Sequence, residues 1–252
     1  MSGVPGIPGG KRFQRKGWVV LAGVVLAVAG LLPWAGVAAA QEVTLLERPV
    51  QVKRKDAKDW TVLNLGDKVK KGDAIRTGMG ARVEITLGNK RVFRIGQASE
   101  VELPELEGGE NKNTNAKVNL VLGRFWAGLL KPLKGGTERF EVQTETATIG
   151  VKGTQFGVDF DKESKASAIS VITGTVAAVP PPPEEKHEVA GPREIAPPQE
   201  ITREEWSVLV TRDQKVIIIP GQAPKVVPMT AEDKADDWVK FNTDRDAAIA
   251  KQ

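Results

Sequence analysis

The chain has 252 residues, with 36 Lys and Arg against 32 Asp and Glu, and therefore a formal charge of +4. It contains no cysteine, which excludes disulfide scaffolds, thiol catalysis and cysteine-based metal or iron–sulfur sites. A single histidine cannot supply a multi-histidine metal site. We therefore expect a folded, non-catalytic protein with no cofactor, no metal ligands and no catalytic residues.

The first forty residues have the pattern of a secretory signal segment. Four basic residues at positions 11, 12, 15 and 16 precede an uncharged run over 17–40, which ends in a small-residue cleavage pattern at Ala38 and Ala40. We predict that residues 1–40 form a signal peptide and are removed. The alternative is an uncleaved anchor in the inner membrane, because 24 residues of helix are about 36 Å long.

This segment also determines the charge and the location of the protein. Residues 1–40 carry four positive charges and no negative ones, so the remaining chain is neutral. The basic excess that is typical of nucleic-acid-binding proteins is then lost, and we expect no nucleic-acid partner. We expect an exported protein, periplasmic or otherwise extracytoplasmic, that contacts the membrane only if the segment is retained.

From residue 42 to residue 179, short segments alternate between apolar and polar residues, as half-buried strands do. Residues 82–87 and 91–95 are two such runs, and the Gly88-Asn89 pair between them predicts a hairpin. The regular recurrence of these short segments predicts a mainly β fold: an antiparallel sandwich, a barrel-like sheet or a short β-solenoid. The other runs are 42–48, 50–54, 60–65, 99–103, 117–122, 124–130, 139–144, 155–161 and 167–179.

The domain boundaries follow from a change in composition. We expect an all-β domain over residues 41–180 and a Pro/Glu-rich linker over 181–204, because consecutive prolines cannot donate ladder hydrogen bonds. Residues 205–252 are expected to form a β-hairpin (206–211 and 215–220) and a helix over 231–250 that packs on the β-domain. Thr230 and Asp233 have the spacing of a helix capping box.

Three segments together carry a family resemblance. Residues 72–78 (GDAIRTG) are similar to G-D-x-I-x-T-G, residues 144–158 (TETATIGVKGTQFGV) to T-x-x-A-x-x-x-V-x-G-T-x-F-x-V, and residues 169–176 to V-x-x-G-x-V. In this order they resemble the FecR domain family, which implies an all-β, extracytoplasmic fold. The positions that carry the resemblance are Gly72, Asp73, Thr77, Gly78, Thr144, Val151, Gly153, Thr154, Phe156, Val158 and Gly174.

The resemblance also implies limits on function. The best-known members are anti-sigma regulators, with a cytoplasmic sigma-binding domain, one membrane helix and a periplasmic part that senses a TonB-dependent receptor. Only sixteen residues precede the apolar run here, so we expect a stand-alone FecR-like module without a sigma-binding domain. We interpret the motif residues as structural, because their glycines are expected at strand ends.

A basic segment is the strongest candidate for binding. Between Arg48 and Arg94 there are 13 Lys and Arg against 5 Asp and Glu. Such a face could bind lipid headgroups, lipopolysaccharide, a wall polymer or an acidic protein, or it could be merely solvated. Trp60 and Trp126 could stack on sugar or belong to the core. The candidate binding residues are Lys53, Arg54, Lys55, Lys68, Lys70 and Lys71.

Other candidate sites are weaker. Asp159, Asp161 and Glu163 would share one strand face, but the spacing of a calcium-binding loop is absent. His187 lies in the predicted linker, without the rigid surround that a general base needs. We therefore expect an envelope protein that acts as a binding or scaffolding module through contacts with protein or anionic polymer. The alternative is a periplasmic signalling module that contacts an outer-membrane receptor and relays to a separate regulator.

Overall fold

The computed structural model describes residues 41–88, 90–107, 114–130, 138–151, 153–181 and 207–251. The predicted signal segment, with Ala38 and Ala40, lies outside the described residues, as does nearly all of the predicted linker, with His187. Within the described residues, no helix has both the length and the apolar character needed to cross a membrane.

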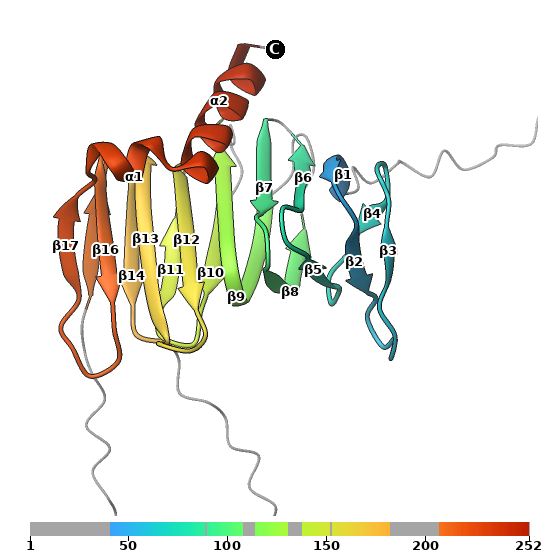
Figure 1. Cartoon of the computed structure of the whole chain (residues 1–252), viewed down its shortest axis with the longest axis horizontal. Helices are drawn as coiled ribbons and strands as arrows, with labels where there is room; N and C mark the ends of the chain where they lie inside the picture. The colour runs from blue at the N-terminus through green and yellow to red at the C-terminus, as the bar shows by residue number, and fades with distance from the viewer. Residues whose placement is uncertain are drawn as a thin grey trace, which may run out of the picture. The chain divides into compact units, whose positions relative to one another are not determined.

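The 17 strands of the described residues form one continuous sheet that folds over itself into two layers, which we refer to as sheet A and sheet B (Figure 1). The strand order in sheet A is β4 (Lys68–Val69), β1 (Gln41–Glu47), β6 (Arg82–Gly88), β7 (Arg91–Ile95), β9 (Thr114–Leu129), β12 (Gln155–Asp161), β13 (Ala166–Thr173), β16 (Gln214–Ile218) and β17 (Lys225–Pro228). The order in sheet B is β3 (Thr61–Leu63), β2 (Val50–Lys53), β5 (Ala74–Thr77), β8 (Glu100–Glu107), β9, β10 (Glu138–Gln143), β11 (Thr148–Val151), β14 (Thr175–Val179) and β15 (Val208–Thr211). The prediction of a mainly β fold is confirmed, as a two-layered sheet that is not closed into a barrel.

Strand β9 connects the two layers. Residues 114–122 pair with β8 and β10 in sheet B, whereas residues 123–129 pair with β7 and β12 in sheet A. At the crossing Gly123 has a φ of +94°, and a Cβ there would be 2.6 Å from the Cα of Ser99, so only glycine fits. The two strands predicted at 117–122 and 124–130 are therefore one bent strand. The β9–β10 pair is also parallel, which the antiparallel prediction missed.

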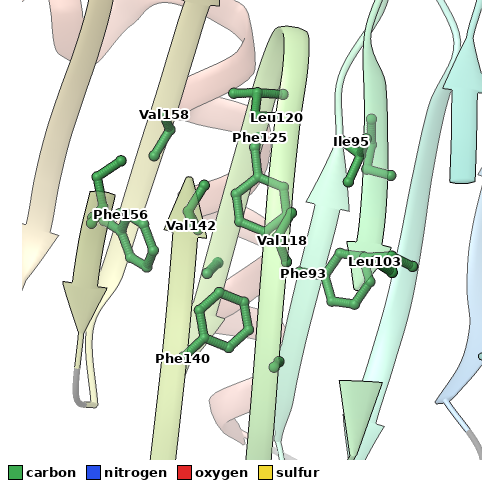
Figure 2. Close-up of a cluster of buried hydrophobic side chains, with 14 of the residues drawn as sticks. Phe93, Ile95, Leu103, Val118, Leu120, Phe125, Phe140, Val142, Phe156 and Val158 are labelled. Carbon is green, nitrogen blue, oxygen red and sulfur yellow. The ribbon is translucent and has the colours of Figure 1, made fainter. Parts of the chain in front are cut away.

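The apolar core lies between the two sheets, and Figure 2 shows its central part. Four phenylalanine rings form a row with centroid separations of 5.7, 6.2 and 6.4 Å. Each such aromatic contact adds about 0.5–1.5 kcal/mol beyond the apolar area that it buries. The row consists of Phe93, Phe125, Phe140 and Phe156.

The prediction of a hairpin between residues 206–211 and 215–220 is wrong. β15 pairs with β14 in sheet B, while β16 pairs with β13 and β17 in sheet A. The chain changes layer at Asp213, which has a φ of 61° and donates its N–H to the carbonyl of Val171. The strand predicted at 167–179 changes layer in the same way at Gly174, between β13 and β14. Local alternation predicts strands, but not the layer to which each belongs.

Two helices follow β17: α1 (Ala231–Ala235) and α2 (Asp237–Lys251), drawn in red in Figure 1. The capping box is present, since the carboxylate of Asp233 accepts the N–H of Thr230 at 2.7 Å and the Thr230 hydroxyl accepts the N–H of Asp233. The single helix predicted over 231–250 is interrupted at Asp236, which has an extended ψ of 132°. Its carboxylate accepts the N–H groups of Trp238 and Val239 and so caps α2.

Candidate anion-binding site

Asp73 joins two loops of the basic segment. Its side chain is 3% exposed and lies in the turn before β5. Its carboxylate accepts the N–H groups of Lys70 at 3.0 Å and Lys55 at 3.2 Å, and forms a salt bridge with Nη1 of Arg54 at 2.7 Å. Arg54 also donates to the carbonyl of Lys68 at 2.7 Å. One buried carboxylate therefore holds segments 53–55 and 68–71 side by side.

The two loops enclose an open hollow of about 580 Å³, which we refer to as the basic hollow. It brings together five of the six predicted basic residues, although twelve residues separate Lys55 from Lys68 in the chain. The hollow is lined by Arg54, Lys55, Lys68, Lys70, Lys71 and Asp73.

Most of the positive charge of the basic hollow has no internal partner. Arg54 forms its salt bridge with Asp73, but the ammonium groups of the four lysines make no ion pair within the described part of the chain. Like charges held close together repel one another and raise the local positive potential. The hollow is therefore suited to a negatively charged group.

Lys53, the sixth predicted residue, is the last residue of β2 and does not line the hollow. Its Nζ is 5.3 Å from the ring centroid of Trp60, and the guanidinium carbon of Arg76 is 4.4 Å from the same ring. Each such cation–π contact contributes about 0.5–1 kcal/mol at an exposed site. Trp126, in contrast, is fully buried beneath α2, so it is not available to stack on a sugar.

The polar motif residues stabilise turns. The hydroxyl of Thr77 donates to the carbonyl of Gly96 at 2.5 Å and accepts the N–H of Ser99 at 2.9 Å. The hydroxyl of Thr144 accepts the N–H of Ala147 at 3.0 Å and lies 2.8 Å from the hydroxyl of Ser167. These hydrogen bonds order the backbone between strands.

The remaining motif residues lie in the core or at tight turns. Val151, Phe156 and Val158 belong to the core between the sheets. Thr154 is buried, and its methyl group would be 2.5 Å from a Cβ at Gly174, which explains the glycine there. The other motif glycines at positions 72 and 153 have positive φ, whereas at Gly78 no atom lies within 4 Å of the place a Cβ would occupy. No motif residue except Asp73 lines the basic hollow.

The row of carboxylates predicted on β12 does not form one site. Asp159 pairs with Nε of Arg124 at 2.7 Å. Asp161 accepts the N–H and the hydroxyl of Ser164, and these hydrogen bonds lower the pKa of its carboxyl. Among the described residues, no three carboxylate, histidine or cysteine side chains are placed to hold a metal ion together.

The sequence analysis missed a buried charge cluster beneath α2. Nε of Arg94 donates to Glu84 at 2.7 Å, and the two side chains are 1% and 2% exposed. Arg245 of α2 binds the same carboxylate at 2.9 Å. Burial raises the pKa of Glu84, but hydrogen bonds from Arg245 and Arg94 and the charge of Arg94 outweigh it and lower the pKa to about 2. The sequence feature that could have predicted this cluster is the pair Glu84 and Arg94, which occupy facing positions of the β6–β7 hairpin.

Comparison with known proteins decides the family of the central part. Residues 73–177 match the family model described as FecR protein. The chain contains a FecR domain. The resemblance seen in the motifs is therefore confirmed. The FecR match begins at Asp73, after the five basic residues of the hollow, and it ends before α2.

Two crystal structures of a candidate anti-sigma factor from Parabacteroides distasonis are similar to this chain. In both comparisons the sequences are 18% identical and the TM-score is 0.46. The alignments cover 66% of this chain and 64% or 63% of the other protein, so the chain spans less than two thirds of the proteins it matches. A comparison with curated protein sequences finds no significant match.

Proposed function

We propose that this protein is an exported, non-catalytic FecR-domain module that binds an anionic polymer of the cell envelope at the basic hollow. The observation that carries the proposal is the convergence of four lysine side chains without internal partners around one hollow. A polymer with regularly spaced phosphate or carboxylate groups would neutralise several of these charges at once. Its binding would therefore fall steeply with salt concentration.

The arrangement of the loops favours a ligand over a merely solvated face. Asp73 and Arg54 are committed to the scaffold, through a salt bridge and three further hydrogen bonds that fix both loops. The loops therefore need little further ordering when a ligand binds, and such preorganisation increases affinity. The side chains of Lys55, Lys68, Lys70 and Lys71 remain available for the ligand.

A signalling role is the second candidate, and the FecR domain favours it. The match to the FecR family model supports a module related to regulation in the envelope. If the protein has this signalling role, the basic hollow binds an acidic surface of an outer-membrane receptor, and the protein transmits the signal to a separate regulator. The two candidates differ in the partner but share the binding surface.

The test is a titration of the purified full-length protein with dextran sulfate, with neutral dextran of the same size as the control. We expect binding to dextran sulfate alone, weaker at 200 mM than at 50 mM salt. The double variant Lys70→Gln/Lys71→Gln should bind at least tenfold more weakly. The matched control Lys162→Gln/Lys240→Gln removes two exposed lysines elsewhere and should bind like the wild type. Equal loss in both double variants would contradict a site at the hollow.

Crosslinking in the native envelope distinguishes the two candidate partners. Capture of polymer that is released by salt, and that is lost in Lys70→Gln/Lys71→Gln, supports the polymer. Capture of one outer-membrane receptor with the same dependence on the two lysines supports signalling and rejects the polymer. Mass spectrometry of the captured protein also tests the predicted start at Gln41.

A further inference from the structure

Three side chains of sheet A hold the carboxylate of Asp246 on α2. Oδ1 accepts a hydrogen bond from Nη1 of Arg94 at 2.7 Å, and Oδ2 accepts from Nε1 of Trp126 and from Nε2 of Gln155, both at 3.0 Å. The donors come from the neighbouring strands β7, β9 and β12. We refer to Arg94, Trp126 and Gln155 as the carboxylate cradle.

Gly128 makes room for the carboxylate. A Cβ at this position would lie 2.6 Å from Oδ1 and 2.8 Å from Oδ2 of Asp246. Glycine inside a strand weakens it and often marks the close approach of another group. Three donors therefore converge on the space that the absence of a side chain at Gly128 leaves free, and together they form a binding site for a carboxylate. Ordinary packing of a helix on a sheet does not require such a site.

The rest of the contact between α2 and sheet A is also largely polar. Asn242 is fully buried and accepts a hydrogen bond from Arg94 at 3.2 Å, while Arg245 pairs with Glu84. The apolar part is small and centres on the Trp126–Trp238 contact. The attraction between buried charges is offset largely by their lost hydration, so the net stabilisation of α2 on the sheet is modest.

The cradle is not saturated by Asp246. Nη2 of Arg94 is buried and has no hydrogen-bond partner in the described part of the chain. A carboxylate can accept two parallel hydrogen bonds from one guanidinium group, but Asp246 uses only Nη1. The cradle therefore has a spare donor that a differently placed carboxylate could use.

The attachment of α2 allows it to move as a unit. The helix is joined to the described part of the chain at its N-terminus, through the interruption at Asp236, and none of its residues belongs to a strand ladder. Near its C-terminal end, α2 is linked to the sheet by a hydrogen bond from Nζ of Lys90 to the carbonyl of Ala250 at 3.0 Å. Release of α2 therefore breaks no strand pairing, which is typical of a segment that opens independently.

We propose that the carboxylate cradle is a binding site for an acid-bearing helix, and that α2 occupies it reversibly. When α2 leaves as a unit, the cradle accepts α2 from a second copy of the chain. Trp238, Asn242, Arg245 and Asp246 all contact sheet A or its side chains and have the spacing of one helical face. The same contacts form whether α2 binds its own sheet or the sheet of a second copy, so exchange of α2 between two copies costs little free energy. This inference is independent of the basic hollow.

Hydrogen exchange on the wild-type full-length protein tests the release. We expect amides of 237–251 to exchange at least tenfold faster than those of β9 and β12, under conditions in which the sheet stays folded. Equal protection of α2 and the central strands would overturn the proposal, because α2 would then leave only on global unfolding.

A labelled peptide of residues 230–251 tests the specificity of the cradle. It is titrated into the full-length Asp246→Asn protein, whose own helix is weakened, and into the wild type. We expect the peptide of natural sequence to bind the variant, and the Asp246→Asn peptide to bind at least tenfold more weakly. The Asp244→Asn peptide is the control, because Asp244 is exposed on the same helix. Equal binding of all three peptides, or no binding, rejects the cradle; if the variant does not fold, the titration of the wild type decides.

Discussion

Glu84 and Arg94 face each other across the β6–β7 hairpin, with 2.7 Å between Oε2 and Nε, and both side chains are nearly fully buried. They lie on the outer face of sheet A, where the alternating pattern predicts contact with solvent. Burial follows because α2 covers this face and adds Arg245 to the same carboxylate. An outward position in a strand therefore became the centre of a buried charge cluster.

This cluster predicts a pH-dependent stability. The pKa of Glu84 is lowered from 4.5 to about 2, so its ionised form stabilises the folded state above about pH 4.5. The stabilisation, at most about 3 kcal/mol, is lost as the pH falls from 4.5 towards 2. We expect Glu84→Gln to lower the free energy of unfolding at pH 7 much more than at pH 2.5, as measured by urea denaturation. Glu47→Gln, which alters a 3.6 Å surface pair, is the control; an equal effect of Glu84→Gln at both pH values would contradict the prediction.

A methyl group at Gly128 should disturb the docking of α2. Gly128→Ala places a Cβ 2.6 Å from Oδ1 of Asp246, and overpacking of this kind costs about 1–3 kcal/mol. We expect faster hydrogen exchange in α2 and a lower free energy of unfolding. Gly150→Ala is the control in sheet B, because no atom lies within 4 Å of a Cβ there. Unchanged exchange in α2 after Gly128→Ala would show that the carboxylate has another position available.

Asp73 should be essential for the order of the basic hollow. Asp73→Asn removes the charge that binds Arg54 and one of the acceptors for the two loop N–H groups, which costs about 1–3 kcal/mol for a buried group. We expect a lower melting temperature and faster exchange over 53–55 and 68–71. Asp56→Asn makes the same charge change at an exposed position with a φ of 64°, which Asn tolerates. If both variants melt alike, Asp73 does not organise the loops.

Gly123 should tolerate no side chain. Gly123→Ala forces a φ of +94° on alanine and places its Cβ 2.6 Å from the backbone of Ser99, so we expect a loss of about 2–3 kcal/mol. Gly78→Ala, with open space and ordinary φ, should be nearly neutral. Chemical denaturation of both variants checks the difference. A small effect at Gly123 would mean that β9 can change layers without this turn.

Much of the fold was predictable because its signal is local. Alternation with a period of two residues identifies strands, and a Gly between two such runs marks a turn, so the mainly β class and the β6–β7 hairpin followed from neighbouring residues. The FecR resemblance was visible for a related reason, since its glycines and threonines serve turns within short segments. The basic residues were also visible as a charge excess between Arg48 and Arg94.

The layer of each strand was not predictable from the sequence. Alternation states that one side of a strand is buried, but it does not state which sheet the strand joins. The crossing of β9 at Gly123 and the separation of β15 from β16 depend on pairings between residues far apart in the chain. Such pairings are stabilised by the assembled core, which no single segment contains.

The two candidate sites show the same division. The amino-acid sequence by itself determined that the basic side chains exist, that they cluster in two short segments, and that the C-terminal helix starts with a capping box. Only the tertiary structure decided that Asp73 holds the two segments around one hollow, and that Asp246 meets Arg94, 152 residues earlier in the chain. The physical reason is that charge and periodicity are properties of local sequence, whereas burial and hydrogen-bond partners depend on which distant segments pack together.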